Sequence, residues 1–311
     1  MSQTVPRVAV LGSINMDLVA RCAKLPGPGE TLIADSFSEI PGGKGANQAV
    51  AAARAGADVT MIGSLGDDAF AERLRDNLLS NRVDCQLLRA CENTPSGTAM
   101  IVVADDGENQ IVVVPGANAK VTPDDVRLAA DAIRNADVLL LQLEIPIDAG
   151  LSAITIARET GTRVVLDPAP VPSHMPTGLY QVDLICPNAN ECAALAESRV
   201  GSMAEIEAAA WTLHDRGSNS VVITLGESGA AFFDGQRFSI VDAFETQAVD
   251  TTAAGDAFAG ALAVRWGETQ DLHEAIRFGN AAGSLAASRE GAQPSIAERH
   301  QILELTQEPR Q

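Results

Sequence analysis

The segment Val249–Ala261 (VDTTAAGDAFAGA) has the residue types that phosphate chemistry needs. Ala253, Ala254 and Gly255 stand where an alanine-rich helix begins, so backbone N–H groups there can approach an anion closely and the helix dipole favours negative charge. Asp256 follows directly and is placed to accept a proton from a hydroxyl that attacks phosphorus. The alternative is an ordinary glycine-containing turn with an aspartate in the first helical turn.

The segment Pro41–Ala49 (PGGKGANQA) is a second candidate ligand loop. It does not match the nucleotide-binding P-loop, because that pattern needs Ser or Thr after the lysine and here Gly45 follows Lys44. The glycine pair that ends at Gly43 still lets a ligand approach the backbone, with Lys44 and Asn47 as polar contacts. A plain turn into a helix is the alternative interpretation.

A third candidate, Asn15 with Asp17, directly follows the first predicted strand. Loops at the carboxyl ends of parallel strands carry ligand sites. The Asp17 carboxylate can accept two hydrogen bonds at once, which suits a vicinal diol. An Asx turn is the alternative for this pattern.

A regular framework must position these three loops. Arg7–Ile14 (RVAVLGSI) is a short apolar run that ends beside glycine and serine, which predicts a buried first strand. Helical patterns at 45–55, 67–79, 148–160, 190–196, 203–216, 255–266 and 271–288 alternate with strand patterns at 58–62, 138–143, 163–166, 184–186 and 220–224. This alternation predicts an α/β fold: an open, mostly parallel sheet with helices on both faces. No G-x-G-x-x-G follows the first strand, which excludes the main dinucleotide-binding pattern.

Four further strand patterns do not alternate with helices. They are 18–22, 31–40, 98–103 and 110–114, and the last two are joined through Asp106–Gly107, a strong hairpin signal. We therefore expect one domain over 1–311, with the strands from about 17–40 and 98–115 inserted as a small β-sheet lid. The apolar runs of the lid need a partner surface, and a second identical lid is the simplest one.

The overall composition limits the partners. The chain has 22 basic and 41 acidic residues, a net charge of −19, which opposes binding to nucleic acid and to anionic membranes. Any anionic substrate would need local neutralisation by Mg²⁺, backbone N–H groups and helix N-termini. Hydrophobic residues make up 46% of the chain and aromatic residues only 4%, a balance that suits parallel strands buried under helices.

Five cysteines form no C-x-x-C pair, which disfavours structural zinc and a disulfide framework. No run reaches the roughly 18 apolar residues that a membrane span requires. The first residues, MSQTVPRVAVLGSI, do not have the pattern of a signal peptide. We therefore expect a cytoplasmic protein with reduced thiols.

Together, these motifs resemble the ribokinase family of carbohydrate and purine kinases. The matching pieces are GSINMD at 12–17, GGKGANQA at 42–49, QLEIP at 142–146, PNANE at 187–191, TLGESG at 224–229, VDTTAAGD at 249–256 and REGAQPS at 289–295. They follow the order of the family along nearly the whole chain. The glycine-rich motif at 42–49, together with GSINMD and QLE, is most similar to the ribokinase branch.

The resemblance implies a role for each matching position. Asp256 matches the catalytic base, which takes the proton of the sugar's primary hydroxyl, and the backbone N–H groups of 253–256 match the anion hole. Sugar contacts are implied for Asn15, Asp17, Gly43, Lys44, Asn47 and Glu144. Nucleotide contacts are implied for Asn188, Thr224, Gly226, Gly229, Gly255 and Asn280. Glu191 matches a residue that organises Mg²⁺ through water. A K⁺ site is implied at Asp250, Thr252, Ala286, Arg289, Gly291 and Ser295.

The implied activity is phosphorylation of D-ribose by ATP to give D-ribose 5-phosphate and ADP, with Mg²⁺ required, K⁺ activating, and a homodimer formed through the lid. A kinase of another pentose, of deoxyribose or of a nucleoside is the alternative among enzymes. A nucleoside kinase would need an apolar or aromatic base pocket in the lid, where Phe37 is the one aromatic residue. A non-catalytic sugar-binding protein on the same fold is the alternative from another class.

Overall fold

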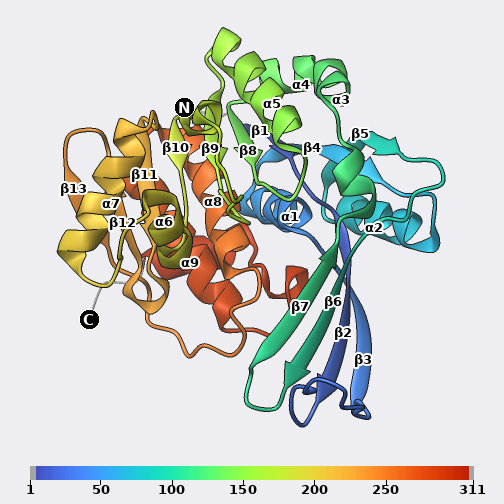
Figure 1. Cartoon of the computed structure of the whole chain (residues 1–311). Coiled ribbons are helices and arrows are strands. Elements are labelled where there is room, and N and C mark those ends of the chain that lie inside the picture. The colour runs from blue at the N-terminus through green and yellow to red at the C-terminus, as the bar shows by residue number, and fades with distance from the viewer. Residues whose placement is uncertain (1–4, 308–311) are drawn as a thin grey trace.

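The computed structural model describes residues 5–307 and arranges their strands in two β-sheets (Figure 1). The larger sheet has nine strands in the order β13-β12-β11-β10-β9-β8-β1-β4-β5. Its parallel strands are β11 (Ser220–Thr224), β10 (Leu184–Ile185), β9 (Arg163–Leu166), β8 (Val138–Leu141), β1 (Arg7–Leu11), β4 (Asp58–Leu65) and β5 (Val83–Ala90). The hairpin of β12 (Ala230–Phe233) and β13 (Phe238–Val241) continues the sheet antiparallel to β11. The predicted open, mostly parallel sheet is confirmed.

Helices cover both faces of this sheet. One layer contains α1 (Lys44–Ala55), α2 (Ala69–Ser80), α8 (Ala254–Thr269), α9 (Leu272–Ala287) and α10 (Arg299–Gln307). The other contains α3 (Pro123–Leu128), α4 (Ala130–Asn135), α5 (Ile147–Thr160), α6 (Ala189–Ala196) and α7 (Met203–Asp215). Short 3-10 turns lie at Gly116–Lys120, Thr177–Tyr180, Gly226–Ser228 and Gln293–Ser295. No helix within 5–307 is long and apolar enough to cross a membrane.

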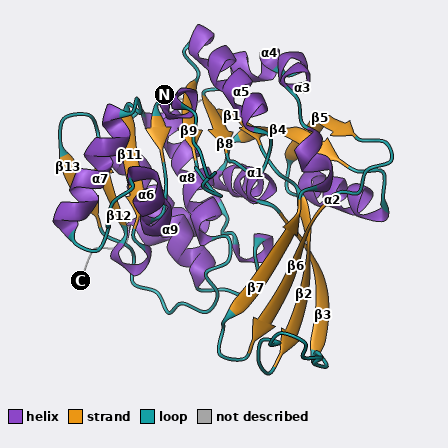
Figure 2. Cartoon of the chain, in the orientation of Figure 1, coloured by secondary structure: helices purple, strands orange, loops and turns teal. Residues whose placement is uncertain are grey.

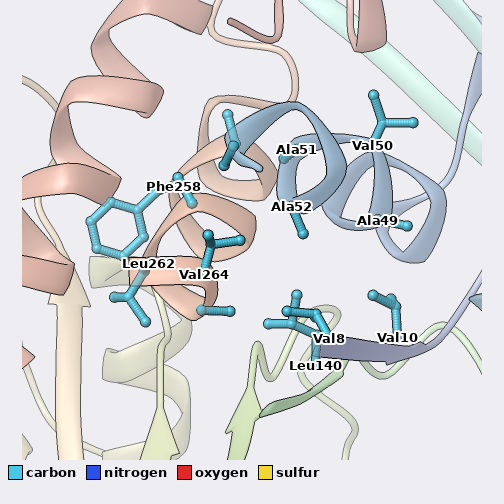
Figure 3. Packing of buried hydrophobic residues seen from close by; sticks show 14 of the residues in the cluster. Val8, Val10, Ala49, Val50, Ala51, Ala52, Leu140, Phe258, Leu262 and Val264 are labelled. Atoms are coloured by element: carbon cyan, nitrogen blue, oxygen red, sulfur yellow. The ribbon is translucent and has the colours of Figure 1, made fainter. Parts of the chain in front are cut away.

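Strand β1 lies between two apolar cores, one on each face of the sheet. Val8 and Val10 pack under the α1/α8 layer, whereas Ala9 and Leu11 belong to the core on the opposite face. This is the period-two alternation of a strand that is buried on both sides. Figure 3 shows the first of these cores, in which alanines of α1 lie beside Phe258 and Leu262 of α8 above Val8 and Val10.

Small residues let α1 and α8 come into close contact. A Cβ atom on Gly260 would lie 2.6 Å from the Cβ of Ala51 and 2.7 Å from the carbonyl oxygen of Gln48, so nothing larger than glycine fits there without movement. This contact brings the first turn of α1, with the predicted ligand residue Asn47, against the first turn of α8, with Asp256.

The smaller sheet projects from the edge of the molecule (Figure 2). Its order is β3-β2-β6-β7, with β3 (Ser36–Gly42), β2 (Asn15–Cys22), β6 (Gly97–Ala104) and β7 (Asn109–Val114). The predicted strand at 31–40 begins only at Ser36, because β2 ends at Cys22 and the pairing register with β3 runs out at Arg21 and Ser36. The N–H of Asp35 still donates to the carbonyl of Arg21, whereas residues 31–34 lie outside the sheet.

Candidate active site

Asp256 lies in the first turn of α8, and its side chain is 6% exposed. Ala253, the N-cap residue of α8, has φ 59°, a left-handed conformation that turns the chain sharply into the helix. Within 5–307, no hydrogen bond uses the backbone N–H groups of Gly255 or Asp256. The space where a Cβ of Gly255 would lie has no neighbour within 4 Å. This helix terminus therefore offers free N–H donors with room for an anion beside them.

Two amides of α1 hold the Asp256 carboxylate. Asn47 Nδ2 donates to Asp256 Oδ2 at 2.9 Å, and Gln48 Nε2 donates to Oδ1 at 3.1 Å. Burial raises the pKa of Asp256 above its ordinary value, while the attraction of Lys44 and these two hydrogen bonds oppose that rise. A carboxylate whose pKa moves toward neutrality is better matched to general-base chemistry than an exposed one.

A second buried carboxylate, Asp167, lies beside the first. Asp167 Oδ2 accepts a hydrogen bond of 2.9 Å from Gln48 Nε2, the same atom that donates to Asp256. Lys44 Nζ is 3.9 Å from Asp167 Oδ2. Burial raises the pKa of Asp167 to about 7, although Lys44 opposes the rise. Asp167, in turn, is the main cause that raises the pKa of Lys44, so this lysine stays charged.

The residues predicted to contact a sugar lie on one side of Asp256, at the base of the small sheet. Burial, reinforced by the charges of Glu144 and Asp256, raises the pKa of Asp17 to about 7. Glu144 accepts hydrogen bonds from the hydroxyl of Ser13 and from the backbone N–H of Lys44. Glu144 and Asp256 therefore lie close enough to Asp17 for their charges to act on it.

Close backbone packing shapes this space. Gly43 has φ 88°, and a Cβ there would lie 2.7 Å from the backbone nitrogen of Asn15. Asn15 is 3% exposed, and its Oδ1 accepts a hydrogen bond of 2.7 Å from Asn118 Nδ2. Asn118 therefore fixes the orientation of the Asn15 amide, and the Nδ2 group of Asn15 points away from Asn118.

On the other side of the α8 terminus there is a cavity of about 880 Å³, which is within the usual range for ligand pockets. It is bordered by the glycine-rich turn after β11, the segment 243–248 and the adjoining faces of α8 and α9. Five of the six residues predicted to contact a nucleotide border it: Thr224, Gly226, Gly229, Gly255 and Asn280. The Asn280 amide donates to the carbonyls of Val241 and Asp242, so it also ties α9 to the end of β13.

Asn188, the sixth predicted nucleotide residue, does not border this cavity. It caps α6: Asn188 Oδ1 accepts from the N–H of Glu191, and the Glu191 carboxylate accepts from the N–H of Asn188, at 2.9 and 2.8 Å. This reciprocal box holds the Glu191 carboxylate near enough to raise the pKa of Lys44. Both residues therefore have a structural role, and Glu191 also adds negative charge at the site.

Asp250 connects the two segments that were predicted to hold a monovalent cation. Its Oδ1 accepts from the N–H and hydroxyl of Thr252 at 2.9 and 2.6 Å, and its Oδ2 accepts from the N–H of Gly291 at 2.9 Å. Burial alone would raise the pKa of Asp250, but these hydrogen bonds hold it below the ordinary value. Of the other predicted positions, the carbonyl of Ala286 accepts from the N–H of Arg289, and Ser295 donates to Ala292.

Among the residues of the site that were not predicted from the sequence are Gln48 and Asp167. Two more are Gln142, whose Nε2 donates to Gln48 Oε1, and Gln293, whose Nε2 donates to Asn47 Oδ1. Gln142 and Asp167 directly follow β8 and β9, so the rule that strand ends carry ligand sites could have found them. Gln48 and Gln293 lie inside quoted motifs, but nothing in those patterns distinguishes them from helix or turn residues.

Comparisons with known proteins show the family and the fold of the chain. A model of the pfkB family of carbohydrate kinases matches residues 5–299. Ribokinase of Haemophilus influenzae is 38% identical over 297 residues, which cover 96% of this chain and 97% of that protein. Deoxyribokinase of Salmonella typhimurium is 34% identical over 304 residues, which cover 96% and 99%. The solved structure of Arabidopsis thaliana ribokinase complexed with ribose and ATP has a TM-score of 0.91 and 32% identity, and the match covers 98% of this chain and 100% of that one.

Proposed function

The chain belongs to the pfkB family of carbohydrate kinases, and on that premise we propose that it transfers the γ-phosphate of ATP to the primary hydroxyl of D-ribose. The observation that carries the proposal is the position of Asp256. Its backbone neighbours Ala254 and Gly255 border the 880 Å³ cavity, while its side chain is close enough to Asp17 for the charge of Asp256 to raise the pKa of Asp17. A group at that point can contact a sugar on one side and a triphosphate on the other.

In the proposed reaction, the ribose hydroxyl donates its proton to Asp256 as its oxygen attacks the γ-phosphorus. The bond from that phosphorus to the β,γ-bridging oxygen breaks, and ADP leaves with the electron pair. The free N–H groups at the start of α8 stabilise the negative charge on the oxygens of the transferred phosphoryl group. We assign ribose recognition to Asn15, Asp17, Gly43, Lys44, Asn47 and Glu144, and nucleotide contact to the residues around the cavity.

The electrostatics of the site favour a divalent cation with the nucleotide. Four carboxylates act on Lys44, those of Asp167, Asp256, Glu144 and Glu191, and Asp17 lies near two of them, so the site needs further positive charge before it can accept a triphosphate. When bound, Mg²⁺ would neutralise phosphate oxygens, and Glu191 is the carboxylate we assign to it through water. We assign K⁺ to the loops joined by Asp250, whose lowered pKa keeps it anionic.

We further propose that the small sheet is a lid and that two lids meet in a homodimer. The register places Val113 and Ile101 on the face that carries Asp17, and Met100 with Val112 on the opposite face. Met100, Val112 and Val113 are 47%, 58% and 45% exposed, so both faces leave apolar area uncovered. This apolar area would be covered if one face of the sheet closed over the sugar and the lids of two subunits paired.

The pairing register of the lid strands also disfavours a nucleoside as the phosphate acceptor. Phe37, the one aromatic residue of the lid strands, pairs with Ala20 and therefore lies on the face opposite to Asp17. An aromatic ring on that face cannot stack on a base held over the site. Deoxyribose remains the second candidate, because the chain is 34% identical to a deoxyribokinase.

The test is an ADP-coupled assay with Mg·ATP across pentoses, 2-deoxyribose, hexoses and nucleosides. We expect the highest kcat/KM with D-ribose. A higher kcat/KM with 2-deoxyribose would make 2-deoxyribose the assigned substrate, and the assignment as a sugar kinase would stand. ADP formation that no sugar or nucleoside increases would contradict the proposed function.

A further inference from the structure

Each oxygen of the Asp256 carboxylate receives one side-chain amide, and a glutamine holds each of those amides in turn. Gln142 Nε2 donates to Gln48 Oε1 at 2.5 Å, and Gln48 Nε2 donates to Asp256 Oδ1 at 3.1 Å. Gln293 Nε2 donates to Asn47 Oδ1 at 3.1 Å, and Asn47 Nδ2 donates to Asp256 Oδ2 at 2.9 Å. Two parallel relays of amides therefore end on the two oxygens of one carboxylate.

The direction of the first relay is fixed by charge. Gln48 faces two carboxylates, Asp256 and Asp167, and only its NH₂ group can donate to both. Its oxygen must then point toward Gln142, which has to present a donor in return. If the Gln48 amide turned over, its oxygen would face both carboxylates and no hydrogen bond would remain to either.

Gln142 is held in an unusual environment for an amide. The residue has no exposed surface, and within 5–307 its Oε1 has no hydrogen-bond partner. A Cβ on Gly12 would lie 1.9 Å from that oxygen, so glycine at position 12 leaves the room that the amide occupies. An apolar side chain of the same size would avoid the cost of burying an unpartnered oxygen. The hydrogen bond from Nε2 to Gln48 is the interaction that accounts for a glutamine here.

We propose that Gln142 and Gln293 are positioning residues for the base, each acting through the amide that it orients. The inference rests on the proposed role of Asp256. Two fixed donors hold the carboxylate plane and still leave a lone pair on each oxygen for the sugar hydroxyl. They also favour the ionised form of Asp256, so they lower the pKa that burial raises.

The test is a double-mutant cycle with isosteric apolar replacements. Gln48→Met should lower kcat about 10-fold, the scale of one hydrogen bond to a charged group, and Gln142→Met about 5-fold. Because Gln142 acts only through Gln48, the double variant should match Gln48→Met rather than show the product of the two losses. KM for ribose should change less than about 2-fold, and the acidic limb of the kcat–pH profile should move to higher pH in every variant. Gln86→Met, at an exposed position of β5, is the matched control, with no change expected.

Two further measurements keep the relay testable if one variant folds poorly or the kinase assignment fails. Gln293→Met should shift the acidic limb in the same direction through Asn47. In the wild type, the ¹³C resonance of the Asp256 carboxyl should titrate at lower pH than in Gln142→Met, whether or not ribose is phosphorylated. Additive losses in the cycle, or an unchanged Asp256 titration in Gln142→Met, would overturn the relay.

Discussion

Replacing Asp256 by asparagine is the most informative single change at this site. The amide has nearly the same size and shape as the carboxylate, so it fits a position that is 6% exposed. It cannot take the proton of the attacking hydroxyl. Asn47 and Gln48 both donate to this side chain, and an amide offers only one acceptor oxygen, so one of the two donors loses its partner.

The expected magnitude follows from those contacts. Loss of a general base lowers kcat by about 10²–10⁴-fold, which corresponds to roughly 2.7–5.5 kcal/mol in activation free energy. An unsatisfied buried donor costs about 1–3 kcal/mol of folding stability. The loss of a buried charge opposes that cost, because burial raises the pKa of Asp256 and so disfavours its ionised form. We therefore expect a folded protein with little turnover and nearly unchanged ribose affinity.

The assay is ADP release with saturating Mg·ATP and ribose, with thermal unfolding measured on the same samples. Asp215→Asn, at the exposed end of α7, makes the same chemical change away from the site and should retain full activity. An Asp256→Asn enzyme that keeps more than about a third of the wild-type kcat would refute the base assignment. A large rise in the KM for ribose at unchanged kcat would assign Asp256 to binding instead.

Three other predictions follow from the remaining groups of the site. If Asp250 and the neighbouring carbonyls hold K⁺, exchanging Na⁺ for K⁺ at fixed ionic strength should raise kcat, and equal rates would remove that site. Asp17 has a pKa of about 7, and sugar hydroxyls donate to its ionised form, so KM for ribose should fall from about pH 6 to about pH 8. The raised pKa means that the folded chain binds this proton more tightly than the unfolded chain, so the contribution of Asp17 to stability should fall as pH rises from about 4 to about 7. Asp17→Asn should remove both dependences. In the lid, Ile101→Asp or Val113→Asp should weaken both dimerisation and ribose binding, and light scattering that gives a monomer mass for the wild type at micromolar concentration would contradict the dimer.

Much of the framework could be predicted because periodicity and loop chemistry act locally. The helices α1, α5, α8 and α9 begin and end within a few residues of the predicted ranges, since glycine, proline or a polar cap marks their limits. The hairpin of β12 and β13 was missed, although Asp234–Gly235 between its strands is the same turn signal that was recognised at Asp106–Gly107. Its alanine- and phenylalanine-rich first strand does not alternate with a helix and therefore falls outside a βα pattern.

The site was predictable in its loops but not in its internal connections. Asp256 and Asn47 are separated by more than 200 residues, and only the close contact of α1 with α8 at Gly260 brings them within 2.9 Å. Asp167 directly follows a short apolar strand, and its proximity to Lys44 depends on which strands are neighbours in the sheet. Strand order and helix approach are tertiary properties, so the amide relays and the paired buried carboxylates become visible only in the structure.

The central claim is transfer of the γ-phosphate to the primary hydroxyl of ribose, and product analysis tests it most directly. Purified protein is incubated with Mg·ATP and D-ribose, and ³¹P and ¹³C NMR identify where phosphate is bound. We predict one equivalent of ribose 5-phosphate for each ADP, with no inorganic phosphate above the protein-free control. ADP accompanied by an equal amount of inorganic phosphate, or phosphate bound at another hydroxyl, would contradict the account.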